Sequence, residues 1–293
     1  MVVDAAYATC LRLARAHYEN FPVASRLLPR RHRPAVAAIY AFARLADDFA
    51  DEGTRPPGNR LVLLDDWQHR LNRAVAGRPD PDDGSDANRI FLALADTIER
   101  YALEPKLFSD LLSAFRQDVT VKRYEDWEAV LDYCRRSANP VGRLVLRVSG
   151  YRQPDLDTAS DAVCTALQLT NFWQDLERDF EKDRVYVPQA VVRRYGASEE
   201  DLGRRRLTPE WRAALGEAAT RTRALFDAGR PVADGVGGRL RWELRATWLG
   251  GTRILDRLER VDFDVFHHRP TLGWMDASII ARRTLAWTFV KHA

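Results

Sequence analysis

Helical spacing of apolar residues is the feature that most constrains the fold of this chain. Long segments place apolar side chains three and four positions apart, and no segment shows a sustained alternation with a period of two. The expected fold class is therefore all-α, a bundle of roughly ten helices or more. No linker divides the sequence convincingly, and no short repeat is visible, so residues 1–293 are expected to form a single domain.

Proline residues mark several boundaries in this helical pattern. Pro140 follows Asn139 inside one predicted helix, where it removes a backbone donor and so predicts a kink. Thr208 followed by Pro209 is typical of a helix start. The predicted helices cover about residues 4–19, 34–52, 60–76, 88–101, 105–120, 126–149, 155–181, 209–228, 240–258 and 274–290, with two short pieces within 189–204.

Composition excludes several classes of protein. The 45 basic and 42 acidic residues leave a net charge of only +3, so no nucleic-acid partner is expected. Three cysteines, far apart in the chain, indicate neither a disulfide framework nor a zinc site. The first residues lack the regions of a signal peptide, and no apolar run approaches ~18 residues. We therefore expect a cytoplasmic protein, with contact at the inner face of a membrane left open.

One predicted helix carries a polar face with two acidic residues. At 100° per residue, Tyr40, Arg44, Asp47 and Asp51 fall within an arc of about 60°. Asp47 and Asp51 are four residues apart, so their like charges weaken an isolated helix. Either Arg44 or a bound divalent cation can compensate, and the sequence leaves both explanations open.

A second predicted helix has the same design. Gln168, Asn171, Asp175 and Asp179 lie within about 80° of arc, backed by apolar residues. If the two acidic faces oppose each other across a bundle, carboxylate and amide oxygens converge, and such ligands suit Mg²⁺ bound together with phosphate oxygens. The alternative is two ordinary amphipathic helices, with polar faces in solvent and aspartates paired to nearby arginines or lysines.

A short loop after Asp179 contains Arg184 and Tyr186 and ends at Pro188. A guanidinium group beside a metal-rich site can hold diphosphate oxygens bidentately, although Arg184 could equally be an ordinary surface residue. The sequence contains no Gly-x-Ser-x-Gly, His-Glu-x-x-His or Gly-Lys-Ser/Thr motif, so serine hydrolase, zinc protease and P-loop chemistries are not indicated.

Together these motifs resemble those of the squalene and phytoene synthase family. The likeness rests on Tyr40-x-x-x-Arg44-x-x-Asp47-Asp48-x-x-Asp51 and Asn171-x-x-Gln174-Asp175-x-x-x-Asp179, closed by Arg184-Val-Tyr186, and covers about residues 7–290. It implies an isoprenoid-synthase bundle around a deep apolar cavity, with Mg²⁺ at its mouth. The metal ligands implied are Asp47, Asp51, Asn171, Asp175 and Asp179, and the four aspartates are the implied catalytic residues.

Two other stretches are similar to the bacterial hydroxysqualene synthase branch of that family. The family pattern His-x-x-Ser-Phe appears here as His17-x-x-Asn20-Phe21. The pattern Tyr-x-x-x-Val-Ala-Gly-x-Val-Gly begins here at Tyr133, with Ser137 in place of Val, Asn139 in place of Gly, and Pro140 after it. Both departures weaken the case for condensation of two farnesyl diphosphates. The branch implies conversion of presqualene diphosphate and water to hydroxysqualene and diphosphate, in hopanoid biosynthesis.

Two alternatives stay open from the sequence. The chain could join two prenyl diphosphates into squalene, presqualene diphosphate or a carotenoid precursor, or it could be a non-catalytic subunit that binds a lipid or a sister synthase. Ser137 and Asn139 are candidates to position the attacking water, although both could instead satisfy the backbone groups freed by Pro140. The expected substrate-binding residues are His17, Asn20, Tyr40, Arg44, Tyr133, Ser137, Asn139, Gln168, Arg184 and Tyr186.

Overall fold

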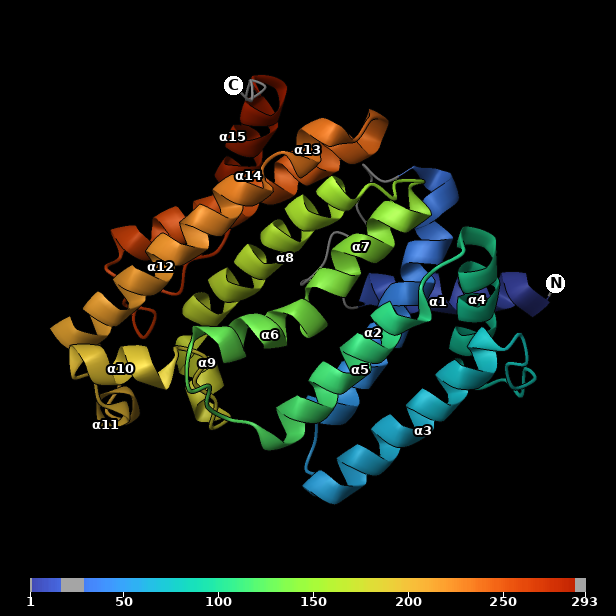
Figure 1. Ribbon diagram of the computed structural model, residues 1–293, viewed down its shortest axis with the longest axis horizontal. Helices are drawn as coiled ribbons and strands as arrows, with labels where there is room; N and C mark the ends of the chain where they lie inside the picture. The colour runs from blue at the N-terminus through green and yellow to red at the C-terminus, as the bar shows by residue number, and fades with distance from the viewer. Residues whose placement is uncertain (1, 17–28, 288–293) are drawn as a thin grey trace. The chain divides into compact units, whose positions relative to one another are not determined.

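The computed structural model describes residues 2–16 and 29–287, and they form α-helices joined by short connections (Figure 1). Within these ranges no β-strand forms, and one isolated parallel bridge joins Arg123 to Val185. The all-α prediction is confirmed. None of the helices in these ranges is both long and apolar enough to cross a membrane.

Contacts divide the chain into two units that alternate along the sequence. Unit 1 falls within residues 1–120 and 140–154, and unit 2 within 121–139 and 155–293. Two expectations depend on how the units are joined: a single domain over residues 1–293 and a deep apolar cavity within it. Both stay predictions.

Unit 1 is organised around α2 (Arg33–Asp51), which packs against the α-helices α1, α3, α4 and α5 and against the short helix η2. Phe42 of α2 is fully buried, and its ring lies 5.5 Å from the ring of Phe108 and 5.9 Å from that of Phe91. Trp67 donates a hydrogen bond from its indole to the carbonyl of Phe42. The other elements are α1 (Val2–Ala16), η2 (Arg30–His32), α3 (Pro57–Val75), α4 (Asp86–Tyr101), α5 (Pro105–Thr120) and α7 (Asn139–Val148), the last of which joins the unit from Pro140 onward.

Unit 2 contains three long helices that run side by side, α8 (Pro154–Gln174), α12 (Pro209–Gly229) and α14 (Gly238–Arg260) (Figure 1). Thr208 caps α12 through a hydrogen bond from the Trp211 amide to its hydroxyl, as the sequence predicted. The remaining helices are α6 (Trp127–Ser137), α9 (Leu176–Glu181), α10 (Gln189–Tyr195), α11 (Glu199–Gly203), α13 (Val232–Gly235) and α15 (Trp274–Leu285).

Three helix predictions need comment. The kink expected at Asn139-Pro140 is confirmed, since α6 ends at Ser137 and α7 begins at Asn139. The single helix expected over 155–181 is wrong, because Asp175 leaves helical geometry (φ −103°, ψ 16°) and separates α8 from α9. The last helix was expected to reach residue 290, but α15 ends at Leu285.

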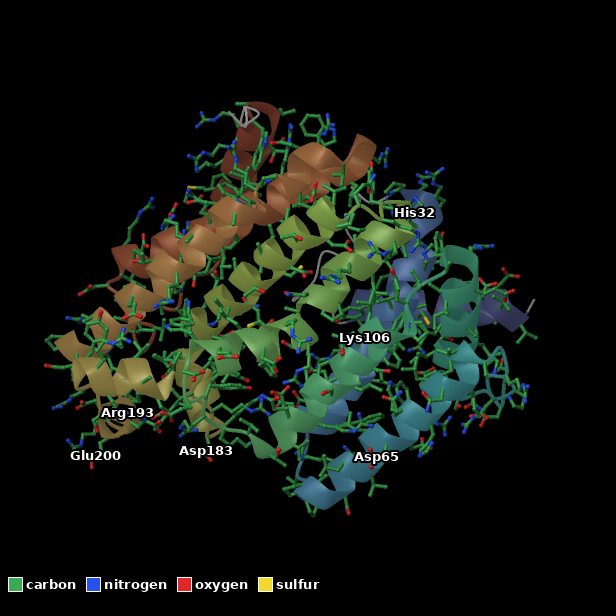
Figure 2. All side chains as sticks on the ribbon, viewed as in Figure 1. His32, Asp65, Lys106, Asp183, Arg193 and Glu200 are labelled. Carbon is green, nitrogen blue, oxygen red and sulfur yellow. The ribbon has the colours of Figure 1, made fainter. Side chains whose placement is uncertain are left out.

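Exposed ion pairs occur in both units, and Asp65, Lys106 and Arg193 are labelled in Figure 2. In unit 1 the exposed Asp65 pairs with Arg116, and Lys106 pairs with Asp110. In unit 2 the exposed Arg193 pairs with Glu125. Such pairs between exposed groups contribute little stability individually, so they do not determine the fold.

Candidate functional site

The first group of candidate residues lies on α2 in unit 1. Tyr40, Arg44, Asp47 and Asp51 are all partly exposed, whereas the opposite face, around Phe42, is buried. The predicted polar face is therefore confirmed. Packing of Phe42 into the core fixes the rotation of α2 and leaves these four side chains open to solvent on one side.

Arg44 pairs with carboxylates of its own helix. Its Nη2 lies 2.6 Å from Asp48 Oδ1, and its Nη1 lies 3.7 Å from Asp47 Oδ2. Arg44 therefore does compensate acidic charge on this helix, mainly that of Asp48. This pairing does not exclude a metal, because the Asp47 side chain is still 44% exposed and offers oxygen atoms to a cation.

Tyr40 lies one turn before Arg44 on α2. Burial raises the pKa of its phenol above the ordinary value; the Arg44 guanidinium opposes this shift, and the Asp48 and Asp47 carboxylates add to it. Tyr40 is therefore a neutral phenol at physiological pH, and it can donate a hydrogen bond to an anionic ligand.

The second group lies at the junction of α8 and α9 in unit 2. Asp175 interrupts the helix, yet the ladder continues across it, since the Asp175 amide donates to the Asn171 carbonyl and the Asp179 amide to the Asp175 carbonyl, both at 2.8 Å. Asn171 is exposed, and Asp175 and Asp179 are partly exposed. Gln168 lies two turns earlier on α8, and Phe172 behind this face is buried.

An arginine that the sequence did not single out contacts this group. Arg269, in the connection before α15, donates from Nε to Asp175 Oδ1 at 2.7 Å. Gln174, the last residue of α8, donates to the carbonyl of Pro270 at 2.6 Å and so holds the same connection in place. Arg178 lies 3.8 Å from the same Asp175 oxygen. Asp175 thus already lies beside two guanidinium groups.

The loop after α9 ties Arg184 to Asp179. The Arg184 amide donates to the Asp179 carbonyl at 2.7 Å, and the Asp183 amide donates to the Phe180 carbonyl at 2.9 Å. Asp183 has a left-handed backbone (φ 58°), so the turn is a Schellman motif that ends α9. Arg184 is buried, which contradicts the alternative that it is an ordinary surface residue.

Tyr133 and Tyr186 belong to a cluster of aromatic rings. The ring of Tyr186 stacks on Phe172 with centroids 3.6 Å apart, and it lies 6.0 Å from the ring of Tyr133. Tyr124 completes the cluster, stacked 5.6 Å from Tyr186. All four rings are buried, so two predicted substrate-binding tyrosines belong to one packed aromatic cluster.

Ser137 and Asn139 differ in their surroundings. Asn139 is buried, and its side-chain oxygen accepts a hydrogen bond from Thr165 of α8 at 2.9 Å. The Ser137 hydroxyl is also buried, but no hydrogen-bond partner for it occurs among the described residues. The side-chain oxygen of Asn139 is therefore engaged by Thr165, whereas Ser137 has unused hydrogen-bonding capacity.

The donor atoms suit Mg²⁺, although nothing among residues 2–16 and 29–287 forms a group of three Asp, Glu, His or Cys side chains that could hold a metal alone. Mg²⁺ usually takes one or two carboxylates and completes its shell with water and phosphate oxygens. The pairs Asp47 and Asp51 on α2, and Asp175 and Asp179 at α9, fit that pattern. His17 and Asn20 lie outside the described residues.

Comparison with known proteins identifies the family. Residues 14–276 match the family model for squalene/phytoene synthase. The chain is 37% identical to hydroxysqualene synthase of Rhodopseudomonas palustris over 94% of each chain, and 40% identical to that of Zymomonas mobilis over 71% of this chain and 67% of the relative.

A solved structure agrees with these sequence matches. Squalene synthase HpnC of Alicyclobacillus acidocaldarius superposes with a TM-score of 0.82 at 39% identity, covering 89% of this chain and 95% of the other. The fold and the sequence similarity along most of the length therefore agree. This chain is an enzyme of the squalene/phytoene synthase family.

Proposed function

We propose that this enzyme converts presqualene diphosphate and water into hydroxysqualene and diphosphate, with Mg²⁺ as cofactor. The observation that carries the proposal is 37–40% identity to relatives named hydroxysqualene synthase, one of them matched over 94% of both chains. The departures at Asn20, Ser137 and Asn139 support the same branch.

The residues proposed to bind diphosphate are those that the family motifs imply. Asp47, Asp51, Asn171, Asp175 and Asp179 would hold Mg²⁺, which when bound offsets negative charge on the leaving group. Arg44 and Arg184 donate hydrogen bonds to diphosphate oxygens, and Arg269 is placed to do so beside Asp175. These donors favour the transition state, because negative charge grows on the diphosphate as the C–O bond breaks.

Water capture requires a hydrogen-bonding group near an otherwise apolar cation. The C–O bond breaks with its electron pair on the diphosphate, the carbocation rearranges, and water adds through its oxygen and loses a proton to solvent. Ser137 is the favoured residue to hold that water, because its buried hydroxyl has no partner among the described residues. Asn139 is a second candidate, and its side-chain oxygen already accepts a hydrogen bond from Thr165.

Isotope labelling tests the reaction. Presqualene diphosphate incubated with the enzyme, Mg²⁺ and ¹⁸O-labelled water should yield a C30 alcohol that carries the label. Asp47→Asn and Asp175→Asn, made separately, should each lower diphosphate release by about 100-fold or more. If both variants release diphosphate at the wild-type rate, the proposed mechanism is wrong. An unlabelled hydrocarbon product would rule out water capture.

A second candidate reaction is condensation of two prenyl diphosphates. It is favoured by the 39% identity to the Alicyclobacillus acidocaldarius protein, whose structure is described as a squalene synthase. Farnesyl diphosphate supplied alone distinguishes the two reactions. A coupled C30 product supports condensation, whereas turnover of presqualene diphosphate only supports the proposed hydration.

Contact with membranes or with sister synthases, and a place in the cytoplasm, remain proposals about the cellular setting. The basic stretch Arg204–Arg206 is a weak candidate for binding anionic lipid, because each arginine faces a carboxylate. Arg204 pairs with Glu200 and Arg206 with Asp201, while Arg205 pairs with Glu177. The local positive charge is therefore largely balanced.

A further inference from the structure

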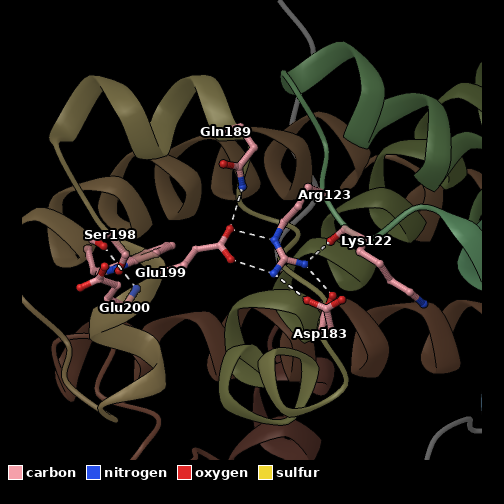
Figure 3. Close-up of polar contacts among 8 residues, drawn as sticks. Lys122, Arg123, Asp183, Gln189, Ser198, Glu199 and Glu200 are labelled. Atoms are coloured by element: carbon pink, nitrogen blue, oxygen red, sulfur yellow. Dashed lines mark hydrogen bonds and ion pairs between the residues drawn. The ribbon is translucent and has the colours of Figure 1, made fainter.

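The segment between α5 and α6 runs beside the loop that carries Arg184 (Figure 3). The Val185 amide donates to the Lys122 carbonyl at 3.0 Å, and the Gln189 amide donates to the Tyr124 carbonyl at 2.8 Å. These bonds form a short parallel pairing centred on Arg123 and Val185. The segment therefore gives the loop backbone a fixed neighbour.

Arg123 connects three separate parts of this region (Figure 3). Its guanidinium group forks onto both Glu199 oxygens at 2.8 and 2.7 Å. The same group donates to the Asp183 carboxylate at 3.0 Å and to the Asp183 backbone carbonyl at 2.5 Å. Gln189 donates to Glu199 at 3.2 Å, which fixes the carboxylate from the other side.

Asp183, which accepts hydrogen bonds from Arg123, has an unusual backbone conformation. Asp183 is the left-handed residue of the turn that closes α9, a conformation in which residues other than glycine are uncommon. The next residue is Arg184, whose amide bonds to the Asp179 carbonyl. Any change in the backbone at Asp183 therefore moves Arg184 relative to Asp179.

We propose that Arg123 is a positioning residue: by holding both the carbonyl and the carboxylate of Asp183 against Glu199, it fixes Arg184 and Asp179 in the arrangement that binds diphosphate. The proposal rests on the proposed function, which assigns diphosphate binding to Arg184 and Asp179. Arginine is required because only its planar fork reaches several acceptors at once, whereas lysine keeps the charge but offers a single centre.

Arg223 provides a matched control within unit 2. It also bridges two carboxylates, Asp256 at 3.0 Å and Glu259 at 2.8 Å, and its side chain is partly exposed like that of Arg123. Arg223→Lys should thus remove a comparable pair of contacts without touching the loop. A loss common to both variants reflects general destabilisation, and a loss confined to Arg123→Lys reflects positioning.

The experiment measures binding as well as turnover in the full-length enzyme. Arg123→Lys should weaken binding of inorganic diphosphate with Mg²⁺, followed by calorimetry, by about 10- to 100-fold and raise KM more than it lowers kcat. Hydrogen exchange at the Arg184 and Val185 amides should accelerate. Arg223→Lys should leave all three readouts as in the wild type.

A further variant tests which contact matters. Asp183→Gly removes the strain of a non-glycine residue with positive φ and keeps the backbone carbonyl that accepts a hydrogen bond from Arg123. This variant should therefore bind diphosphate far better than Arg123→Lys does. Equal losses in Arg123→Lys and Arg223→Lys, or wild-type binding in Arg123→Lys, overturn the positioning role. Asp179→Asn separates the two proposals: if it binds Mg²⁺ and diphosphate normally, the proposed function itself fails.

Discussion

At the scale of single residues, arginines already contact an aspartate on each candidate helix. Arg44 lies within 4 Å of Asp47, and Arg269 donates to Asp175 at 2.7 Å. A guanidinium group held by a carboxylate keeps its orientation, so under the proposed function these donors are already placed when diphosphate binds. The same arginines balance part of the aspartate charge, since Arg44 lies beside Asp48 and Asp47 and Arg269 beside Asp175.

Asp276 is a residue whose charge stabilises the fold. Its carboxylate accepts hydrogen bonds from the Gly273 amide and from Arg253 and Arg257, and these contacts, the Gly273 bond first, hold the pKa of Asp276 below its usual range. A lowered folded pKa means that this stabilisation is complete above the unfolded pKa, about 3.9, and disappears as pH falls through the folded pKa.

Asp276→Asn should therefore lower the free energy of unfolding at pH 7, with a gap from the wild type that narrows below about pH 4. Urea unfolding followed by circular dichroism between pH 7 and 3 measures it. Asp65→Asn is the control, because the exposed Asp65 carboxylate should matter little at any pH. A gap that stays constant with pH would contradict the ionic explanation.

Sequence reasoning singled out the candidate aspartates but neither Arg269 nor Arg123, which contact aspartates in the structure. Asp47, Asp51, Asn171, Asp175 and Asp179 stand out because helical spacing places them on common faces. Arg269 lies 94 positions from its partner Asp175, and Arg123 lies 60 positions from Asp183. No local pattern connects such residues, since only tertiary packing brings them together.

At the scale of elements, helix existence was easier to predict than helix continuity. Apolar spacing located α8 and α9 but could not reveal the break at Asp175, because the apolar residues on either side keep the same period. The break between α6 and α7 was predictable, since Pro140 has a local steric effect on Asn139. At Asp175 the break is accompanied by contacts from Arg269 and Pro270. These residues are far away in the sequence, so no local pattern could reveal the contacts.

Close approach of α12 to α8 depends on one glycine. A Cβ atom at Gly229 would lie 2.7 Å from the Val163 nitrogen and 2.8 Å from the Ala159 oxygen, both backbone atoms. Gly229→Ala should therefore destabilise unit 2 by about 1–3 kcal/mol, because the helices must separate. Chemical denaturation measures the change in the free energy of unfolding.

Gly216 on the same helix supplies the control. A Cβ atom there meets nothing within 4 Å, so Gly216→Ala should stabilise the protein by about 0.4–1 kcal/mol through helix propensity. If Gly229→Ala is as stable as the wild type, the two helices can adjust their spacing freely, and the packing argument is wrong.

At the scale of the whole molecule, the family assignment and the two units describe different properties. The match over residues 14–276 spans parts of both units, so the family pattern belongs to the chain as a whole. The all-α class followed from periodicity alone. The division into units did not, because its boundary at Asn139 and Pro140 falls inside a stretch that reads as helical on both sides.

Unit 1 includes residues 140–154, which follow a stretch of the chain that belongs to unit 2. Arg147 of α7 is buried and donates to Glu104 at 2.7 Å, and Arg152 donates to the Tyr101 carbonyl at 2.5 Å. A fragment of residues 1–154 should therefore resist limited proteolysis better than one of residues 1–120. Arg147→Ala in the longer fragment should remove much of the difference, and equal resistance of the two fragments would contradict this dependence.

The alternation of units also orders events during synthesis. Chains emerge from the ribosome from the N-terminus at about 5–20 residues per second, and domains tend to fold as they appear. Residues 121–139, which carry Arg123, emerge before unit 1 has received α7 and before the partners of Arg123 exist. Arg123 cannot make its contacts until Asp183 and Glu199 have been synthesised, so the contacts by which it is proposed to position Arg184 are among the later ones to form as the chain is made.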